Sequence, residues 1–136
     1  MNFGAIGSII GHEITHAFDN LAAQIKNSSD TKNAEDYINI TQCFIEQYNN
    51  YHVTEVDFIP INFTTDGIAT LKENIADCGG VKLAYNTFKN WSLNANITKA
   101  IGLDEFSDEK IFWISFAQTY CSVERPGNSI NTCSSV

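Results

Sequence analysis

The fold of this chain is decided by the stretch Gly11-His12-Glu13-Ile14-Thr15-His16. It has the form H-E-x-x-H, and on a helix its two histidines project from one face about one turn apart. This spacing suits two ligands of a single zinc ion. Glu13 is rotated off the metal axis, so its carboxylate reaches a water molecule on the metal without binding the metal itself. The stretch therefore predicts a metal site and a general base together.

The helix that carries this stretch is expected from about Phe3 to Leu21 and has two faces. Its polar face holds His12, His16 and Asp19 at intervals of four and three. Its apolar face, which we expect to pack against the core, holds Ile6, Ile9, Ile10, Ile14 and Phe18. Glycines each cost about 1 kcal/mol in a helix interior. Their spacing indicates either close approach by another backbone or an indistinct helix start, at Gly4, Gly7 and Gly11.

Three more helices are expected downstream. One runs from about Thr31 to Tyr48, one from near Thr70 to Trp91 with Thr70 and Glu73 fitting a capping box, and one starts at Ser107-Asp108. Their expected core positions recur at helical spacing. These positions are Ala34, Tyr37, Ile38, Thr41, Phe44, Ile45 and Tyr48, then Leu71, Ile75, Cys78, Val81, Ala84, Tyr85 and Phe88, and then Ile111, Phe112, Ile114, Ala117 and Tyr120.

The segments between these helices are expected to be connections. Tyr51–Phe63 is rich in β-branched and aromatic residues but alternates poorly and contains Pro60, so an extended connection or an edge strand is expected. Thr65-Asp66-Gly67 indicates a turn, and Arg125-Pro126-Gly127 a loop. Since no repeat or Pro-rich linker divides the chain, residues 1–136 are expected to form a single, mainly α domain.

Composition limits the classes of partner. The chain has 136 residues, of which 43% are hydrophobic, so it can build a core. Its net charge of -8 argues against nucleic acid and against an anionic membrane surface. No apolar run approaches the roughly 18 to 20 residues of a spanning helix. We therefore expect no transmembrane segment in this chain.

Two features favour an extracellular compartment. Four cysteines, at positions 43, 78, 121 and 133, either form two disulfides, with three possible connectivities, or remain free thiols. In addition, N-glycosylation acceptors matter only in a secretory lumen or outside the cell. The acceptor asparagines are Asn27, Asn39, Asn62, Asn90 and Asn96.

The third helix supplies what the first one lacks. A catalytic zinc ion usually has three protein ligands and one open position, so two histidines need a third group. Glu73 and Asp77 lie four residues apart on one face of this helix, within a run apolar enough to be buried. Because a buried carboxylate is costly unless it is paired or binds a metal, these two are the best candidates.

At this point a resemblance becomes specific. The segments that carry it occur in the same order and at similar spacing in the neprilysin family of zinc metallopeptidases, and they cover nearly the whole chain. They are Asn2-Phe3-Gly4, then Gly11 to Asp19, then Thr70-Leu71, Glu73-Asn74-Ile75-Ala76-Asp77 and Gly79-Gly80, and finally Phe116-Ala117-Gln118, Cys121 and Arg125-Pro126.

The resemblance implies a fold, a cofactor and a set of roles. The fold is a zincin-like (gluzincin) catalytic core, mainly helical with little or no strand, present as a partial domain. One zinc ion per chain is bound by His12, His16 and Glu73, and Glu13 activates the water. Asp77 and Asp19 orient the histidines, and Asp77 is also the residue usually assigned a proton-donating role. The substrates are oligopeptides, cut on the amino side of hydrophobic residues.

The chain also departs from the family pattern. Family members are large ectoenzymes with a membrane anchor and a second helical domain, which is the expected intramolecular partner. The upstream substrate-binding strand and the downstream His and Arg that stabilise the oxyanion are not found in these 136 residues; loss of one such donor costs about two to three powers of ten in rate. Two hypotheses follow: a secreted or cell-surface zinc endopeptidase, or a non-catalytic zinc-binding fragment or divergent secreted paralogue.

Overall fold

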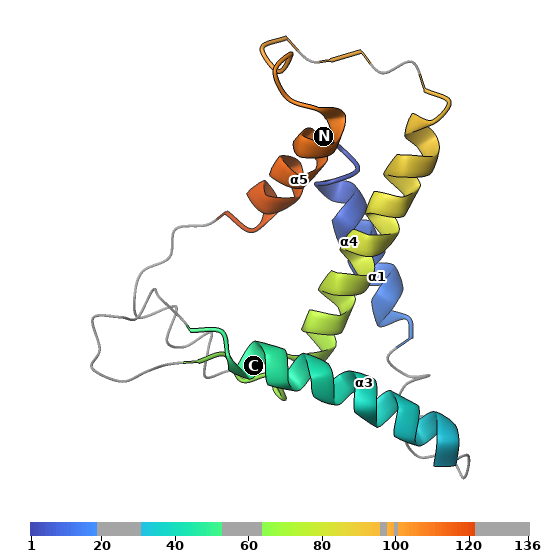
Figure 1. Ribbon diagram of the computed structural model, residues 1–136, viewed down its shortest axis with the longest axis vertical. Coiled ribbons are helices and arrows are strands. Elements are labelled where there is room, and N and C mark those ends of the chain that lie inside the picture. Colours follow the sequence, from blue (N-terminus) through green and yellow to red (C-terminus); the bar gives the residue numbers. More distant parts are fainter. Residues whose placement is uncertain (19–30, 53–63, 96–97, 100, 122–136) are drawn as a thin grey trace. The chain divides into compact units, whose positions relative to one another are not determined.

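The chain is described here by a computed structural model, and it is mainly helical (Figure 1). The residues that the structure describes are 1–18, 31–52, 64–95, 98–99 and 101–121. They contain the helices α1 (Ile6–His16), α3 (Thr31–Asn49), α4 (Leu71–Ser92) and α5 (Asp108–Thr119). Within these ranges there is no strand, only an isolated antiparallel bridge between His52 and Thr64. The expected mainly α class is confirmed.

The contacts group the chain into two compact units. Unit 1 consists of Met1–Ala17 and Ala76–Cys121, and unit 2 includes the described residues of Phe18–Ile75. The division falls inside α4, which is one continuous helix.

In unit 1, α1 lies alongside α4 with the two backbones in direct contact (Figure 1). A Cβ atom built on Gly11 would lie 2.6 Å from the carbonyl oxygen of Gly80. A Cβ built on Gly80 would lie 2.5 Å from the backbone nitrogen of His12 and 2.7 Å from the carbonyl oxygen of Ser8. Real Cβ atoms do not come this close, so both positions require glycine. The close approach that the glycine spacing in α1 indicated is therefore present.

The contact between α4 and α5 is built from large aromatic side chains instead. Ala84, Phe88 and Phe112 form the buried cluster, and the side chain of Phe112 is only 1% exposed. The rings of Phe88 and Phe112 stack with centroids 5.5 Å apart. Ser107 caps α5 by accepting a hydrogen bond from the backbone N–H of Lys110, as the sequence predicted for this helix start.

The expected core face of α1 is wrong. Its apolar residues are between 44% and 58% exposed, namely Ile6, Ile9, Ile10, Ile14 and Phe18. The buried side of α1 is the one with Ser8 and Gly11, because only small residues let the backbones of α1 and α4 touch. Periodicity identified two faces, but hydrophobicity selected the wrong one.

Other positions expected in helix cores are also exposed. Ile38 on α3, Cys78 on α4, and Ile114, Ala117 and Tyr120 on α5 all face solvent in the structure. Each of these helices buries only a narrow stripe of residues. Apolar residues at the edges of a wider hydrophobic face therefore stay exposed to solvent.

Unit 2 contains α3 and the turn that leads into α4. The backbone N–H of Gly67 donates to the side-chain oxygen of Asn49 at 2.7 Å, and a Cβ on Gly67 would lie 2.4 Å from the carbonyl oxygen of Ile45. Asp66 accepts hydrogen bonds from the backbone N–H groups of the two residues that follow Gly67. These contacts hold the expected turn at residues 65–67 against α3.

The positions of α3, α4 and α5 agree closely with expectation, but α1 begins three residues later than predicted and ends at His16 rather than near Leu21. Most of Tyr51–Phe63, the loop at residues 125–127, and residues 19–21 lie outside the described residues. None of the described helices is long and apolar enough to cross a membrane. The described cysteines, at positions 43, 78 and 121, are exposed. The sequence left disulfides and free thiols open, and the structure has free thiols at these three positions.

Candidate metal centre

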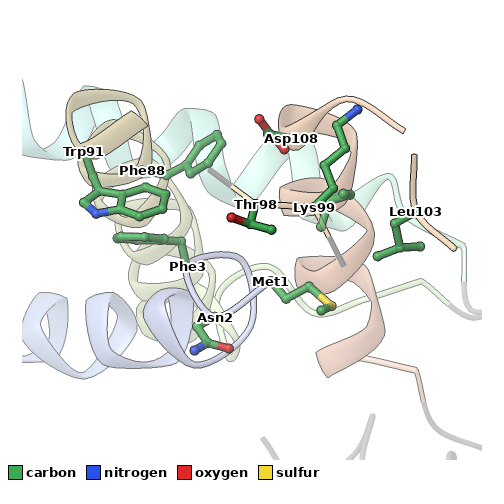
Figure 2. Close-up of a pocket in the computed structure, with 10 residues that line it drawn as sticks. Met1, Asn2, Phe3, Phe88, Trp91, Thr98, Lys99, Leu103 and Asp108 are labelled. Atoms are coloured by element: carbon green, nitrogen blue, oxygen red, sulfur yellow. The ribbon is translucent and has the colours of Figure 1, made fainter. Parts of the chain in front are cut away.

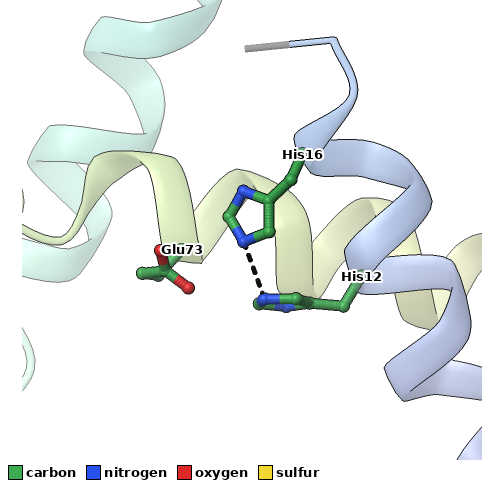
Figure 3. Close-up of side chains that lie close together, drawn as sticks. All are labelled: His12, His16 and Glu73. Atoms are coloured by element: carbon green, nitrogen blue, oxygen red, sulfur yellow. Dashed lines mark hydrogen bonds between the residues drawn. The ribbon is translucent and has the colours of Figure 1, made fainter.

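The two histidines of α1 bring their Nε2 atoms close together. His12 and His16 lie on consecutive turns of the helix, and their Nε2 atoms are 2.9 Å apart (Figure 3). Their rings meet edge to face, with centroids 4.5 Å apart. The two imidazoles therefore project from the same side of α1, as the four-residue spacing predicted, and their Nε2 atoms are hydrogen-bonded to each other.

Asp77 fixes the orientation of His12. Its Oδ1 atom lies 2.8 Å from Nδ1 of His12, and the two side chains are 33% and 19% exposed, respectively. A carboxylate only accepts hydrogen bonds, so Nδ1 of His12 carries the proton and donates it. Nε2 of the same ring then carries a lone pair, the form in which imidazole binds a metal, and in the structure this atom is hydrogen-bonded to Nε2 of His16. The contact between Gly11 and Gly80 is what brings α1 close enough to α4 for this bond to form.

Glu73 lies one helical turn before Asp77 on α4. One carboxylate oxygen of Glu73 and one ring nitrogen from each of His12 and His16 all lie within 4.8 Å of one another (Figure 3). Glu73 is exposed and Asp77 is a third exposed, so the expectation that these carboxylates are buried is wrong. Glu73 and Asp77 are related because they lie on the same face of α4, and not because both are buried.

The donor set fits zinc. Two imidazole nitrogens and one carboxylate form a three-ligand set known from catalytic zinc sites, with a fourth position left open. Two nitrogens on one tetrahedral zinc ion are about 3.3 Å apart. The observed 2.9 Å separation of the Nε2 atoms therefore needs to open by only a few tenths of an ångström, which a small rotation of either ring supplies.

Glu13 is exposed and lies beside these groups, at a small cavity of about 200 Å³. The cavity is lined by Ile9, His12, Glu13, Asp77, Thr119 and Tyr120. A carboxylate that lines this cavity is open to water and shares the cavity with His12. Glu13 is outside the His–His–Glu group, and its role as general base stays a prediction.

The structure adds one residue that the sequence did not single out. The hydroxyl of Tyr120 donates to Oδ1 of Asp77 at 2.9 Å, the same oxygen that accepts from His12. Tyr120 was interpreted only as a core position of its helix. No spacing rule joins it to Asp77, 43 residues away, because the contact depends on how α5 packs on α4. Asp19, predicted to orient a histidine, lies outside the described residues.

A second cavity in unit 1 is larger, about 360 Å³, and shares no lining residue with the first (Figure 2). Figure 2 shows the ring of Phe3 against the indole of Trp91, with Lys99 and Asp108 on the other side. The centroids of the Phe3 and Trp91 rings are 5.2 Å apart. The Lys99 ammonium donates to the backbone carbonyl of Asp104. This cavity therefore does not belong to the histidine site.

Comparison with known proteins identifies the family. The family model of peptidase family M13 matches residues 1–135. The chain is 37% identical to neprilysin-21 of Caenorhabditis elegans over 96% of its length, 40% identical to endothelin-converting enzyme 1 of Bos taurus over 95%, and 40% identical to neprilysin-2 of Drosophila melanogaster over 92%. It spans 17% of the length of the first two relatives and 16% of the third. On these matches, the chain belongs to peptidase family M13, the neprilysin family.

Proposed function

We propose that this chain forms the zinc-binding catalytic portion of a metalloendopeptidase that hydrolyses peptide bonds in oligopeptides. One observation carries the proposal. The Nε2 atoms of His12 and His16 lie 2.9 Å apart, and one ring nitrogen of each histidine and one carboxylate oxygen of Glu73 all lie within 4.8 Å of one another. Membership of a peptidase family supports the reaction class.

In this proposal His12, His16 and Glu73 hold one zinc ion. When bound, zinc lowers the pKa of a water molecule to about 7 and polarises the peptide carbonyl. Glu13 takes a proton from the attacking water and passes it to the leaving amine, as one positioned acid–base group does in two successive steps. Its exposure to the small cavity beside His12 supports this role, because both the water and the amine must reach the carboxylate.

Asp77 has a positioning role in this scheme. By accepting a hydrogen bond from Nδ1–H of His12, it selects the tautomer that can bind a metal through Nε2 and holds the ring plane in one direction. The proton-donating role implied by the resemblance is compatible with its place in the cavity that Glu13 also lines. The hydrogen bond to His12 is the stronger support, since it specifies one atom of Asp77 and one atom of the ligand.

An extracellular setting is part of the proposal. Two of the five glycosylation acceptors lie on described helices, Asn39 on α3 and Asn90 on α4, and both side chains are exposed. Loss of apparent mass on treatment with a peptide N-glycosidase tests this setting. Unchanged mobility of protein made in its native host would contradict it.

One observation favours a second candidate, a zinc-binding chain without peptidase activity. The cavity that Glu13 lines has a volume of only about 200 Å³. Sites for drug-sized ligands usually have about 300 to 1,000 Å³, so an oligopeptide needs more enclosing surface than the described residues supply. Metal content is the same under both candidates, whereas turnover differs.

Turnover is therefore the decisive experiment. We expect the purified protein to cleave a quenched fluorescent peptide in a chelator-sensitive reaction. Glu13→Gln should lower the rate by about 100- to 10,000-fold while zinc stays bound. Glu35→Gln, a change of the same kind at an exposed position of α3, is the matched control and should have no effect. If the protein binds zinc but shows no chelator-sensitive cleavage, and Glu13→Gln does not change the measured rate, the non-catalytic candidate is correct.

The ligand assignment has a separate test. Zinc stoichiometry measured by atomic absorption should be one per chain for the unaltered protein and close to zero for His16→Ala and Glu73→Ala. The control is His52→Ala, which removes the histidine that lies outside the motif and is exposed in unit 2. If the two ligand variants retain full zinc, the assigned ligands are wrong.

A further inference from the structure

The end of α5 reaches the metal centre through Tyr120. This residue follows the last residue of the helix, and its backbone N–H still donates to the carbonyl oxygen of Ala117, so its Cα position is set by the helix. Its ring packs edge to face against that of Phe116, with centroids 5.2 Å apart. The backbone and the ring are both held, and the hydroxyl is therefore presented in a defined direction.

That direction is towards Asp77. The Tyr120 hydroxyl lies 2.9 Å from Oδ1 of Asp77, and Nδ1 of His12 lies 2.8 Å from the same atom. One carboxylate oxygen therefore accepts a hydrogen bond from α5 and another from α1, while its own backbone belongs to α4. A carboxylate with a single partner can rotate about its side-chain torsions. Two donors from different helices leave it one orientation in which both bonds form.

We propose that Tyr120 is a positioning residue of the metal centre, which holds Asp77 in the orientation that directs Nε2 of His12 at the metal. This proposal rests on the proposed function, since it assumes that His12 is a ligand. Tyr120 acts through Asp77 and is not itself a ligand, because a neutral phenol on a carboxylate has its proton engaged. Its effect should therefore vanish when Asp77 is absent.

The size of the effect follows from its place in this chain of contacts. Groups that hydrogen-bond directly to a metal ligand change metal affinity by about 10- to 100-fold when removed. Tyr120 is one step further away and its side chain is 55% exposed, so water competes for the carboxylate. We expect Tyr120→Phe to raise the zinc dissociation constant by about three- to tenfold.

The test is a double-mutant cycle on zinc affinity, measured by competition with a chromophoric chelator. The four proteins are the unaltered chain, Tyr120→Phe, Asp77→Ala and the double variant. Tyr85→Phe is the matched control, because Tyr85 on α4 also donates its hydroxyl to a carboxylate, that of Glu109, without any link to the histidines. A second readout is the visible absorption of the Co²⁺-loaded protein, which reports the ligand geometry. Circular dichroism confirms that each variant is folded.

The proposal expects weaker zinc binding and an altered Co²⁺ spectrum for Tyr120→Phe, no change for Tyr85→Phe, and no further loss when Tyr120→Phe is added to Asp77→Ala. It is overturned if Tyr120→Phe binds zinc as the unaltered chain does, or if its loss is the same with and without Asp77. If the unaltered chain itself binds no zinc, the proposed function has failed. Failure of the Tyr120 proposal looks different, because in that case the unaltered chain binds zinc and Tyr120→Phe does not change the affinity through Asp77.

Discussion

Unit 1 contains two helix contacts built on opposite principles. Between α1 and α4 there are no side chains at the closest point, where Gly11 meets Gly80 and a built Cβ would lie 2.6 Å from a backbone oxygen. Between α4 and α5 the contact is made by Phe88 and Phe112, with ring centroids 5.5 Å apart. The second contact contains the buried rings of Phe88 and Phe112, whereas the first brings two helix backbones close together.

The difference explains where the candidate site lies. Short side chains such as histidine and aspartate can meet across two helices only if the backbones approach closely, and they do so beside the glycine contact, at His12 and Asp77. Across the aromatic contact, hydrogen bonds are made by long side chains, from Tyr85 to Glu109 and from Tyr120 to Asp77. We therefore expect stability to depend mainly on the aromatic contact and metal geometry mainly on the glycine contact, and substitutions should separate the two.

The largest change in stability is expected from Phe112→Ala. Removing a fully buried aromatic ring costs about 3 to 5 kcal/mol, because the lost burial is compounded by a cavity. Urea unfolding followed by circular dichroism measures this cost, and Phe112→Leu should recover most of it. Zinc affinity, measured where the variant is still folded, should fall by no more than the roughly three- to tenfold expected for Tyr120→Phe, because α5 reaches the metal centre through Tyr120. A larger loss of zinc affinity would show that the two contacts are not separable.

A smaller loss of stability with a larger loss of zinc affinity is expected from Gly11→Ala. The added methyl group meets backbone atoms of Gly80 that cannot move aside, so the helices separate at a cost of about 1 to 3 kcal/mol. The hydrogen bond from His12 to Asp77 then lengthens, and zinc affinity should fall by about tenfold or more. Gly7→Ala is the control on the same helix, since its Cβ would meet atoms at 3.3 Å and beyond. Equal behaviour of the two variants would contradict a special role for the Gly11 contact.

Most of the helices, and the grouping of His12, His16 and Glu73, could be predicted from the sequence. Periodicity and the capping serine at Ser107 gave α3, α4 and α5 to within one or two residues. The H-E-x-x-H spacing placed His12 and His16 on one face. These predictions succeeded because they depend on neighbours within one helical turn.

What the sequence could not supply was contact between helices. The isoleucines of α1 were expected in the core because they are hydrophobic, yet the contact with α4 selects the glycine side. Asp77 was expected to be buried, but it is a third exposed and is held by two hydrogen bonds instead. The link from Tyr120 to Asp77 depends on the packing of α5, which no local pattern specifies.

The smallest expected effect is on the pH dependence of stability, and it comes from the hydroxyl of Tyr85, which reaches from α4 to Glu109 on α5. The pKa of Tyr85 is raised above its ordinary 10.0, because its hydroxyl donates to the Glu109 carboxylate, with smaller contributions from desolvation and from the negative charge of Glu109. A raised pKa in the folded state means that this stabilisation is complete below pH 10 and is lost as the pH rises through the raised pKa.

The difference in unfolding free energy between Tyr85→Phe and the unaltered protein should therefore shrink as the pH increases above 10. Urea unfolding at a series of alkaline pH values measures this difference, with ultraviolet titration of the phenol to locate its pKa. A difference that does not vary with pH would show that the bond to Glu109 makes no contribution.

The central claim, that α1 and α4 together bind zinc through two imidazoles and a carboxylate, is tested most directly by X-ray absorption at the zinc edge of the zinc-loaded protein. We predict one zinc ion per chain with only nitrogen and oxygen neighbours, at about 2.0 to 2.1 Å, and the multiple-scattering signal of two imidazole rings. The exposed thiol of Cys78 lies next to Asp77 in the sequence. A sulfur neighbour at about 2.3 Å, or a signal from fewer than two imidazoles, would contradict the claim.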